Sequence, residues 1–283
     1  MNNIIPQIPL AEWVDSLLKW MTTTFSWLTR AFSAVVGTGI DWISEALLFI
    51  PPIILILAIG GLAWFISTRK IAIGSVIGLL FIWNLGLWEP TVSTITLVLL
   101  STGIAVLVGV PLGIVAALNE TFFKIVKPIL DFMQTMPAFV YLIPAIPFFG
   151  LGGVSAIFAT VIFSIPPAIR LTALGIKQID KELIEACVSF GTTTRQKLFK
   201  VQMPLAMPTI MAGVNQTIML SLSMTVIASM IGAGGLGGEV WRAIQRLRPG
   251  QGFAAGLGVV IVAIILDRIT QHIGDPGAKS KKK

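Results

Sequence analysis

The chain of 283 residues is 55% hydrophobic and only 12% charged, with a mean hydropathy of +0.90; soluble domains carry about 25% charged residues, so an ordinary soluble domain is excluded. Its apolar runs of about 20 residues are continuous rather than alternating, which predicts an all-α polytopic membrane protein and not a β-barrel. The net charge of +7 gathers in a few loops and in the terminal "KSKKK", which indicates loops that face anionic lipid and predicts no nucleic-acid partner.

The first 45 residues contain a helical pattern of intermediate polarity. Between Leu10 and Val36 apolar residues recur at helical spacing, while Asp15, Lys19 and Arg30 lie between them. Such a mixed stripe with tryptophans is typical of a helix that lies in the membrane interface. We therefore expect residues 1–45 to form an amphipathic interfacial region, with an ordinary first span as the alternative.

Seven apolar segments of roughly membrane-spanning length follow this region. We expect transmembrane helices at residues 46–66, 71–88, 91–118, 128–150, 153–170, 206–229 and 252–270. The first two would form a peripheral pair within residues 46–90, and the others a core within residues 91–271. Residues 272–283 would form a basic cytoplasmic tail.

The charges between these segments predict how the chain is oriented. Basic residues follow the first, third and seventh expected spans: Arg69, Lys70, Lys124, Lys127 and Arg268. Since positive loops stay in the cytoplasm, the N-terminus is expected outside and the C-terminus in the cytoplasm. One loop departs from the rule and carries three arginines on the expected outer side: Arg242, Arg246 and Arg248.

The expected span 128–150 is rich in proline. It contains Pro128, Pro137, Pro144 and Pro147. Each interior proline removes a backbone hydrogen bond and tends to kink the helix, and broken backbone at membrane depth is tolerated where it is buried in protein or lines a wet cavity. Gln134 adds polarity to this segment, which therefore either lines a pathway or packs against other helices.

Residues 171–205, between the fifth and sixth expected spans, are too polar to cross a membrane. Ile179, Leu183, Ile184 and Val188 recur at helical spacing and predict a short amphipathic helix. Gly191 is a suitable helix stop because glycine adopts the left-handed conformation at low cost, and a threonine among residues 192–194 can cap a second short helix. A rigid helix–turn–helix of this kind can transmit force from a partner, whereas a simple connecting loop is the alternative.

The expected span 206–229 carries an unusually polar band. Its members include Asn215, Gln216, Ser221 and Ser223. Polar groups in hydrocarbon must face a partner or water. The band therefore either forms hydrogen bonds between helices or lines a solute path, and the two roles are compatible at the centre of a homodimer.

The segment "GAGGLG", residues 232–237, fits the dinucleotide-binding pattern G-x-G-x-x-G. It follows a membrane span rather than a strand, and no acidic residue follows about 20 positions later to bind a ribose. We interpret it as a flexible outer turn and not as a nucleotide site.

One motif in the cytoplasmic segment connects the chain to a known family. Glu185-Ala186-Cys187, three residues, Gly191, nine residues and then Val201-Gln202-Met203-Pro204 resemble the EAA motif of ABC-importer permeases, E-A-A-x3-G-x9-I-x-L-P. Cys187, Val201 and Met203 depart from the pattern but stay small or apolar. Segments from about Thr94 to Gln271 closely resemble the permease subunits of glycine betaine/proline betaine importers, among them "MPAFVYLIPAIPFFG" and "PPAIRLTALGI".

The resemblance implies a type I ABC-importer permease fold and a bacterial inner-membrane location. It also implies two other partners besides a second copy of the chain, namely a separate ATPase and an external solute-binding protein. The motif residues would dock on the ATPase: Glu185 would pair with a basic residue, Ala186 and Cys187 would allow close approach, Gly191 would make the turn, and Pro204 ends the motif. No G-x-x-x-x-G-K-[ST] loop occurs in the chain, so we expect no enzymatic activity and no bound cofactor here, with ATP and Mg²⁺ held by the partner.

The substrate implied by the resemblance is glycine betaine or a related osmoprotectant taken up under osmotic stress. A permease for choline, carnitine or another small solute is the nearest alternative. An ion-coupled secondary transporter is a different class, and it would be expected to place ionisable residues in the middle of its spans, where this sequence has almost none.

Overall fold

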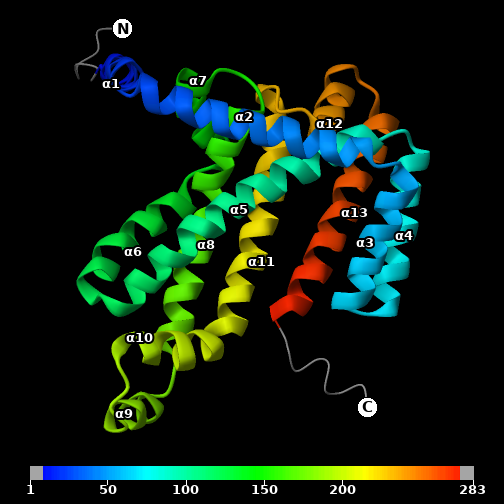
Figure 1. The fold of residues 1–283 in the computed structure, drawn as a ribbon. Helices are drawn as coiled ribbons and strands as arrows, with labels where there is room; N and C mark the ends of the chain where they lie inside the picture. Colours follow the sequence, from blue (N-terminus) through cyan, green and yellow to red (C-terminus); the bar gives the residue numbers. More distant parts are fainter. Residues whose placement is uncertain (1–8, 275–283) are drawn as a thin grey trace, which may run out of the picture.

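The computed structural model describes residues 9–274, and every regular element in that range is a helix (Figure 1), which confirms the all-α class. Residues 1–8 and the end of the expected basic tail, residues 275–283, lie outside the described residues. The elements are, in chain order, α1 Leu10–Thr24, α2 Ser26–Phe49, α3 Pro52–Ile66, α4 Arg69–Asn84, α5 Trp88–Leu118, α6 Glu120–Thr135, the 3₁₀-helix η1 Ala138–Tyr141, α7 Leu142–Phe149, α8 Gly153–Lys177, α9 Lys181–Ser189, α10 Thr194–Lys197, the π-helix η2 Leu198–Gln202, α11 Met203–Ala228, the 3₁₀-helix η3 Ser229–Ile231, α12 Gly235–Gln245 and α13 Pro249–Gly274.

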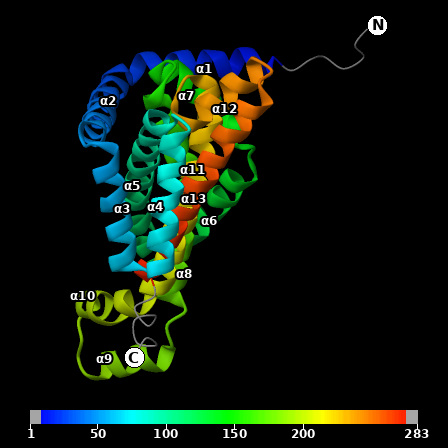
Figure 2. The same ribbon diagram turned by 90° about the vertical axis from the view of Figure 1, so that its right-hand side faces the viewer.

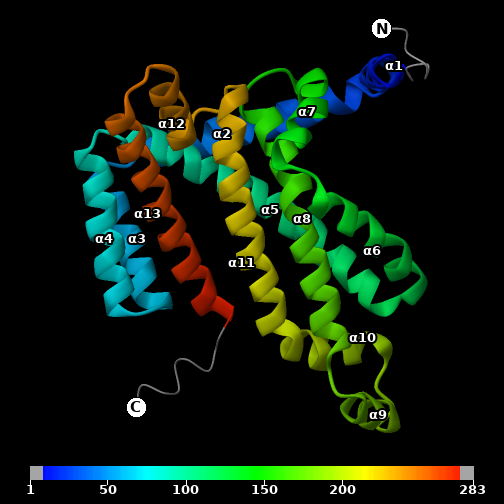
Figure 3. The same ribbon diagram turned by 180° about the vertical axis from the view of Figure 1, so that it is seen from behind.

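The long helices form a bundle in which α8 packs against both α5 and α11 (Figures 1 and 3). The helix α13 packs on α11, and the pair α3–α4 flanks the bundle on the α13 side. The helices α1, α2, α7 and α12 lie at one end, which we call the α12 end. The helices α9 and α10 lie at the opposite end, the α9 end, in all three views (Figure 2).

Five helical stretches in residues 9–274 are long and apolar enough to cross a membrane, and the bent pair α6 with η1–α7 would make a sixth. The five are α2, α5, α8, the continuous stretch Thr194–Ile231 and α13. The expected span 46–66 is shorter than predicted, because its first residues belong to α2 and the new helix begins only at Pro52. At 1.5 Å per residue, the 15 residues of α3 extend about 22 Å, less than the roughly 30 Å of a hydrocarbon core.

The expected span 128–150 is not one helix. The chain bends by 111° between α6 and the η1–α7 segment. Pro137 lacks the N–H that would continue the helix and disfavours the helical conformation at the preceding residue, and Met136 is accordingly extended, with ψ of 136°. The Tyr141 hydroxyl donates a hydrogen bond back to the Met133 carbonyl across the bend. The prolines predicted a kink, and the structure contains a complete break.

The N-terminal helices lie on the outside of the fold. No residue of α1 is buried, and only Val36 of α2 is. Although α2 is long enough to span a membrane, it runs across the α12 end at a steep angle to α8 and α11 (Figure 1). A helix that crosses the end of a bundle in this way suits the interfacial region expected from the sequence.

Glycines let α8 approach both of its neighbours closely. A Cβ atom added to Gly113 of α5 would lie 2.6 Å from Cβ of Thr172, and one added to Gly175 of α8 would lie 3.0 Å from Cβ of Thr209. Small residues at such contacts are the usual basis of helix packing in membranes, because they bring the backbones into van der Waals contact. The three helices α5, α8 and α11 therefore form one tightly packed unit.

Candidate functional site

The helix α9 projects beyond the bundle at the α9 end (Figures 1 and 2). It contains the first part of the motif found in the sequence, Glu185-Ala186-Cys187, and none of its residues is buried. The helix α8 ends at Lys177 and α9 begins at Lys181, so only three residues separate the projecting helix from the packed unit. A movement of α9 would therefore be passed directly to α8.

The turn after α9 has the predicted geometry. Gly191 has φ of +73°, a conformation that glycine adopts without the steric cost paid by other residues. Its N–H donates to the Val188 carbonyl at 2.9 Å. Thr192 closes the turn, since both its N–H (3.2 Å) and its hydroxyl (2.7 Å) donate to the carbonyl of Cys187.

The chain after the turn is fixed by a capping box and then by the core. The Thr193 hydroxyl accepts from the Gln196 N–H at 3.3 Å, and the Gln196 side chain accepts from the Thr193 N–H at 2.9 Å, so two free donors at the start of α10 are satisfied. Leu198 is buried in a cluster with Ile176 of α8 and Ala206 of α11. The expected second short helix is thus continuous with α11 through the π-helix η2.

The projecting helix presents a mixed surface to its surroundings. Leu183, Val188 and Phe190 have exposed fractions of 42%, 57% and 88%. Glu185 is exposed beside them, and within the described residues it makes no ion pair. An exposed apolar group around an unpaired carboxylate is typical of a protein–protein contact rather than of a solvated loop. Pro204 is exposed in the first turn of α11.

The predicted polar band of α11 divides over different faces of the helix. The amide of Asn215 donates to the Asp267 carboxylate of α13 at 2.9 Å, and its oxygen accepts from the Thr270 hydroxyl. Gln271 donates to the same carboxylate at 2.7 Å. Asn215 therefore belongs to a hydrogen-bond network between α11 and α13, the first of the two roles considered for this band.

Of the other residues expected to line a solute path, three are exposed and one is buried. Gln134 of α6 and Gln216 and Ser223 of α11 are exposed. Ser221 is fully buried, and its hydroxyl has no partner among the described residues. The hydroxyl of Ser164 in α8, the helix that packs on α11, is buried and without a described partner as well.

Two interactions of charged residues within the helices were not predicted from the sequence. Arg170 of α8 forms an ion pair with Asp131 of α6, which ties the bent helix α6 to the packed unit. Asp267 is the acceptor at the centre of the α11–α13 network. Both carboxylates lie inside expected spans, and an ionisable residue at such a position usually has a partner, so their presence was the available signal.

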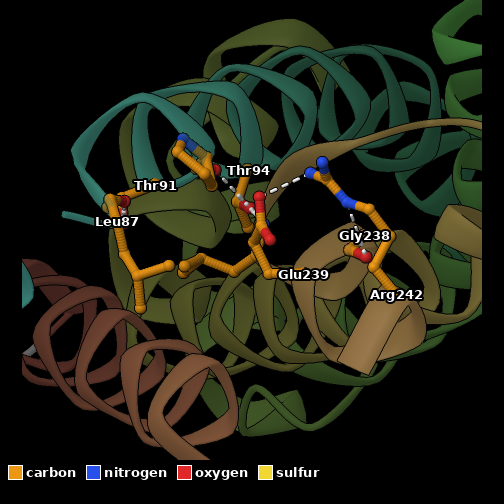
Figure 4. Close-up of polar contacts among 8 residues, drawn as sticks. Leu87, Thr91, Thr94, Gly238, Glu239 and Arg242 are labelled. Atoms are coloured by element: carbon orange, nitrogen blue, oxygen red, sulfur yellow. Dashed lines mark hydrogen bonds and ion pairs between the residues drawn. The ribbon is translucent and has the colours of Figure 1, made fainter. Parts of the chain in front are cut away.

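The glycine-rich segment 232–237 is a packed junction and not the flexible turn expected from the sequence. Gly235 has φ of +69°, and a Cβ atom there would lie 2.5 Å from the Thr94 hydroxyl oxygen of α5. That oxygen accepts the Leu236 N–H at 2.8 Å, and the Thr94 hydroxyl donates its own proton to the Pro90 carbonyl. Nearby, Arg242 pairs with Glu239 and donates to the Gly238 carbonyl (Figure 4). Nowhere in residues 9–274 do three His, Cys, Asp or Glu side chains come together in a way that could hold a metal ion.

Comparison with known proteins places this geometry in context. Residues 109–275 match the model of the family described as binding-protein-dependent transport system inner membrane component. The chain is 53% identical to the glycine betaine transport system permease protein OpuAB of Bacillus subtilis, over 99% of this chain and 97% of that protein. It is 51% identical to the glycine betaine/carnitine transport permease protein GbuB of Listeria monocytogenes, over 94% of this chain and 96% of that protein. It is also 47% identical to the glycine betaine/proline betaine permease protein ProW of Escherichia coli, over 94% of this chain and 75% of that protein.

Solved structures share the fold at lower sequence identity. A chain of the MetNI methionine ABC transporter in an inward-facing conformation superimposes with a TM-score of 0.57. The two chains are 21% identical, and the match covers 68% of this chain and 94% of that one. The expected ABC-importer permease fold is therefore confirmed.

Proposed function

The chain belongs to the family of binding-protein-dependent transport system inner membrane components, and from this membership we propose that it is the permease subunit of an ATP-driven importer of glycine betaine or a related osmoprotectant. The observation that carries the proposal is the 53% identity to a glycine betaine permease over almost the whole of both chains. Uptake of such solutes serves the response to osmotic stress. Carnitine is the second candidate substrate, because one relative of similar identity is described as a glycine betaine/carnitine permease.

We propose that α9 is the coupling helix on which a separate ATPase subunit acts. Glu185 is exposed and free to pair with a basic residue of that subunit, and Phe190 and Val188 offer apolar contact area beside it. Ala186 and Cys187 are small enough for close approach. Gly191 holds the turn, and the segment ends at Pro204 in the first turn of α11. ATP and Mg²⁺ would be bound by the ATPase, and this chain would bind no cofactor.

We propose a solute path along the exposed face of α11 in a homodimer. Gln216 and Ser223 are exposed on α11, and Gln134 is exposed on α6, so a second copy could enclose these polar groups around a water-filled passage. Asn215 and Ser221 would lie behind the residues that line the path. The side chain of Asn215 is bound to Asp267 of α13, and Ser221 is buried. Alternating access would follow if the ATPase shifts the equilibrium between two arrangements of the packed unit of α5, α8 and α11.

The membrane arrangement is proposed from the distribution of charge and from the fold. The N-terminus and the α12 end would lie outside, and the C-terminus and the α9 end in the cytoplasm. Residues 1–45 would be the interfacial region, residues 46–90 a peripheral pair, residues 91–271 the core with its coupling segment 171–205, and residues 272–283 the basic tail. An external solute-binding protein would deliver the solute to the α12 end.

The coupling proposal is tested by uptake of labelled glycine betaine into proteoliposomes that hold the chain, its ATPase, its solute-binding protein and internal ATP. Glu185→Arg reverses the charge offered to the ATPase, and Gly191→Pro cannot adopt φ of +73°. We expect both variants to lose uptake and stimulated ATP hydrolysis by tenfold or more while they remain folded. Glu120→Arg, the same charge reversal at the start of α6, is the matched control and should retain uptake.

Three outcomes would contradict the proposal in different ways. Normal transport by Glu185→Arg and Gly191→Pro would reduce α9 to a connector. Equal loss in Glu120→Arg would indicate a general charge effect rather than a coupling contact. Uptake by the wild type without ATPase or ATP would show that the chain is not an ATP-driven importer subunit.

A further inference from the structure

An elongated apolar cavity separates the peripheral pair α3–α4 from the core helices. Its volume is about 630 Å³, within the range of about 300–1,000 Å³ that holds small molecules in proteins. One stripe of α5 lines the cavity from Trp88 to Leu107 and recurs every three or four residues, and the facing walls come mainly from α3, α11 and α13. At 1.5 Å per residue this stripe is about 28 Å long, so the cavity is narrow, with a mean cross-section of roughly 20 Å².

The walls of this cavity offer almost nothing to water. Every lining residue is apolar except Thr91, Thr102 and Thr270. The Thr91 hydroxyl donates to the Leu87 carbonyl and the Thr270 hydroxyl to the Asn215 side-chain oxygen, while the Thr102 hydroxyl is buried. A cavity without available polar partners stays dry, and the walls of an empty cavity would lose their van der Waals contacts. We therefore expect an apolar molecule as the occupant.

The cavity opens sideways between α3 and α5. Leu62 of α3 and Leu99 and Leu107 of α5 line it, and their exposed fractions are 51%, 50% and 75%. Since α5 is long and apolar enough to cross a membrane, this opening lies beside lipid tails. The cavity continues that lipid-facing surface inward as far as Val262 of α13, which is only 2% exposed.

This opening does not coincide with the face proposed for the homodimer. Val214 and Ile218 of α11 line the cavity, whereas Gln216 lies two residues from each of them. With 3.6 residues per turn, two residues are separated by about 200°, so Gln216 projects from nearly the opposite side of α11. A second copy that encloses Gln216 would leave the cavity facing the bilayer. A helix is also about 10–12 Å across with its side chains, too wide for a cavity of this cross-section.

One end of the cavity lies beside three basic residues. Thr270 lines the cavity toward the α9 end of the bundle, two residues after Arg268. The connection between α3 and α4, where α4 begins with Arg69 and Lys70, lies level with this end of α13 in all three ribbon views (Figures 1, 2 and 3). These three basic residues are exposed, and none of them makes an ion pair within residues 9–274.

The other end of the cavity lies beside acidic residues. Leu47 and Trp88 line this end, and Glu45 and Glu89, close to them in the chain, are exposed. The three arginines near this end line a separate, polar cavity. A phosphate group would therefore be attracted to the end near Thr270 and repelled by the end near Trp88.

From this shape, polarity and charge we propose that the cavity binds one acyl chain of a phospholipid, with the phosphate near Arg268, Arg69 and Lys70. An extended alkyl chain is a single methylene wide, which suits a long and narrow cavity. The acyl chain enters between α3 and α5 and fills the space between the peripheral pair and the core. The bound lipid thus forms part of the contact that holds α3 and α4 on α5 and α13.

The test uses the full chain in proteoliposomes of phosphatidylcholine with a trace of phosphatidylcholine that carries a photoreactive diazirine on one acyl chain. After illumination, mass spectrometry of peptides locates the lipid adducts. We expect adducts at Val262 and Ile265, which line the cavity but are only 2% and 7% exposed. The surrounding bilayer does not reach such residues, so adducts there report an acyl chain inside the cavity.

Two glycine substitutions show whether the adducts depend on the cavity. Gly103 lines it, and a Cβ atom there would meet nothing within 4 Å, so Gly103→Phe fills the cavity without a clash. We expect this variant to lower the adducts at Val262 and Ile265 at least fivefold. Gly74→Phe is the matched control, because Gly74 of α4 is equally open but does not line the cavity, and its adducts should stay within twofold of the wild type.

A charge reversal tests the position of the phosphate. Arg268→Glu places a negative charge at the end of the cavity near Thr270 and should lower the adducts at least threefold. Lys124→Glu makes the same reversal at an exposed site in α6, away from the cavity lining, and should leave the adducts within twofold of the wild type.

Each other result overturns the assignment. Absence of adducts at Val262 and Ile265 in the wild type would show that no acyl chain enters the cavity. Undiminished adducts in Gly103→Phe, or an equal loss in Gly74→Phe, would show that these adducts do not report on the cavity. Undiminished adducts in Arg268→Glu would remove the phosphate from this end. A changed oligomeric state in Gly103→Phe would identify a second copy as the occupant. None of these results touches the proposed transport function, which uptake measures separately.

Discussion

Substitution of Gly235 tests whether the glycine-rich segment is a packed junction. An alanine Cβ would have to tolerate φ of +69° and would lie 2.5 Å from the Thr94 hydroxyl oxygen, which also accepts the Leu236 N–H. The left-handed conformation costs about 1–2 kcal/mol, overpacking a core contact costs about 1–3 kcal/mol, and loss of a hydrogen bond costs about 1 kcal/mol. We expect Gly235→Ala to lower the free energy of unfolding by about 3–6 kcal/mol.

Gly232→Ala separates the backbone effect from the packing effect. Gly232 has a similar φ of +88°, but the only neighbour a Cβ would meet is the Gly152 nitrogen, at 3.9 Å. This variant should therefore lose only about 1–2 kcal/mol. Chemical unfolding of both variants in detergent, followed by circular dichroism, measures the difference. Equal losses would refute the tight contact between Gly235 and Thr94, and with it the interpretation of this segment as a junction.

Two further predictions concern the helix contacts. Asn215→Leu should lower the free energy of unfolding by about 2–3 kcal/mol, because the Asp267 carboxylate loses a hydrogen bond. Gln216→Leu, at an exposed site on the same helix, should change that free energy by under about 0.5 kcal/mol. Equal effects of the two substitutions would place Asn215 outside the network. Gly113→Val should impair assembly of α5 on α8 and cost about 3 kcal/mol or more, since its Cβ would lie 2.7 Å from an α8 carbonyl. Gly103→Val, with nothing within 4 Å, is the control. Chemical unfolding followed by circular dichroism measures both variants, and a similar loss in the control would contradict the close approach.

Local sequence was sufficient for the features that depend on neighbouring residues. Apolar length predicted helices, because in hydrocarbon every backbone group must be paired within the helix itself. The turn at Gly191 was predicted for the same kind of reason, since a left-handed helix end is settled by the residue at that position. The capping threonine was predicted only to within residues 192–194, because three consecutive threonines can all cap a helix, and the structure selects Thr193.

Features that depend on distant residues were decided by tertiary structure. The prolines of the segment 128–150 predicted kinks, but only the structure shows that the chain bends by 111° there and that the Tyr141 hydroxyl donates to the Met133 carbonyl across the bend. The polarity of Asn215 was evident, yet its partner Asp267 lies 52 residues away. Likewise, nothing near Gly235 in the chain indicates that Thr94, 141 positions earlier, fills the space above it.

The sequence by itself therefore determined the class of the protein, its family motif and the position of the projecting helix α9 with the turn that follows it. These follow from hydrophobicity, charge and residue spacing, which act over a few residues or over the width of a membrane. Tertiary structure alone decided which polar residues of α11 are exposed and which are bound to other helices, and it alone showed that Gly235 packs against Thr94. The physical reason is that burial and close packing depend on residues that only the fold brings together.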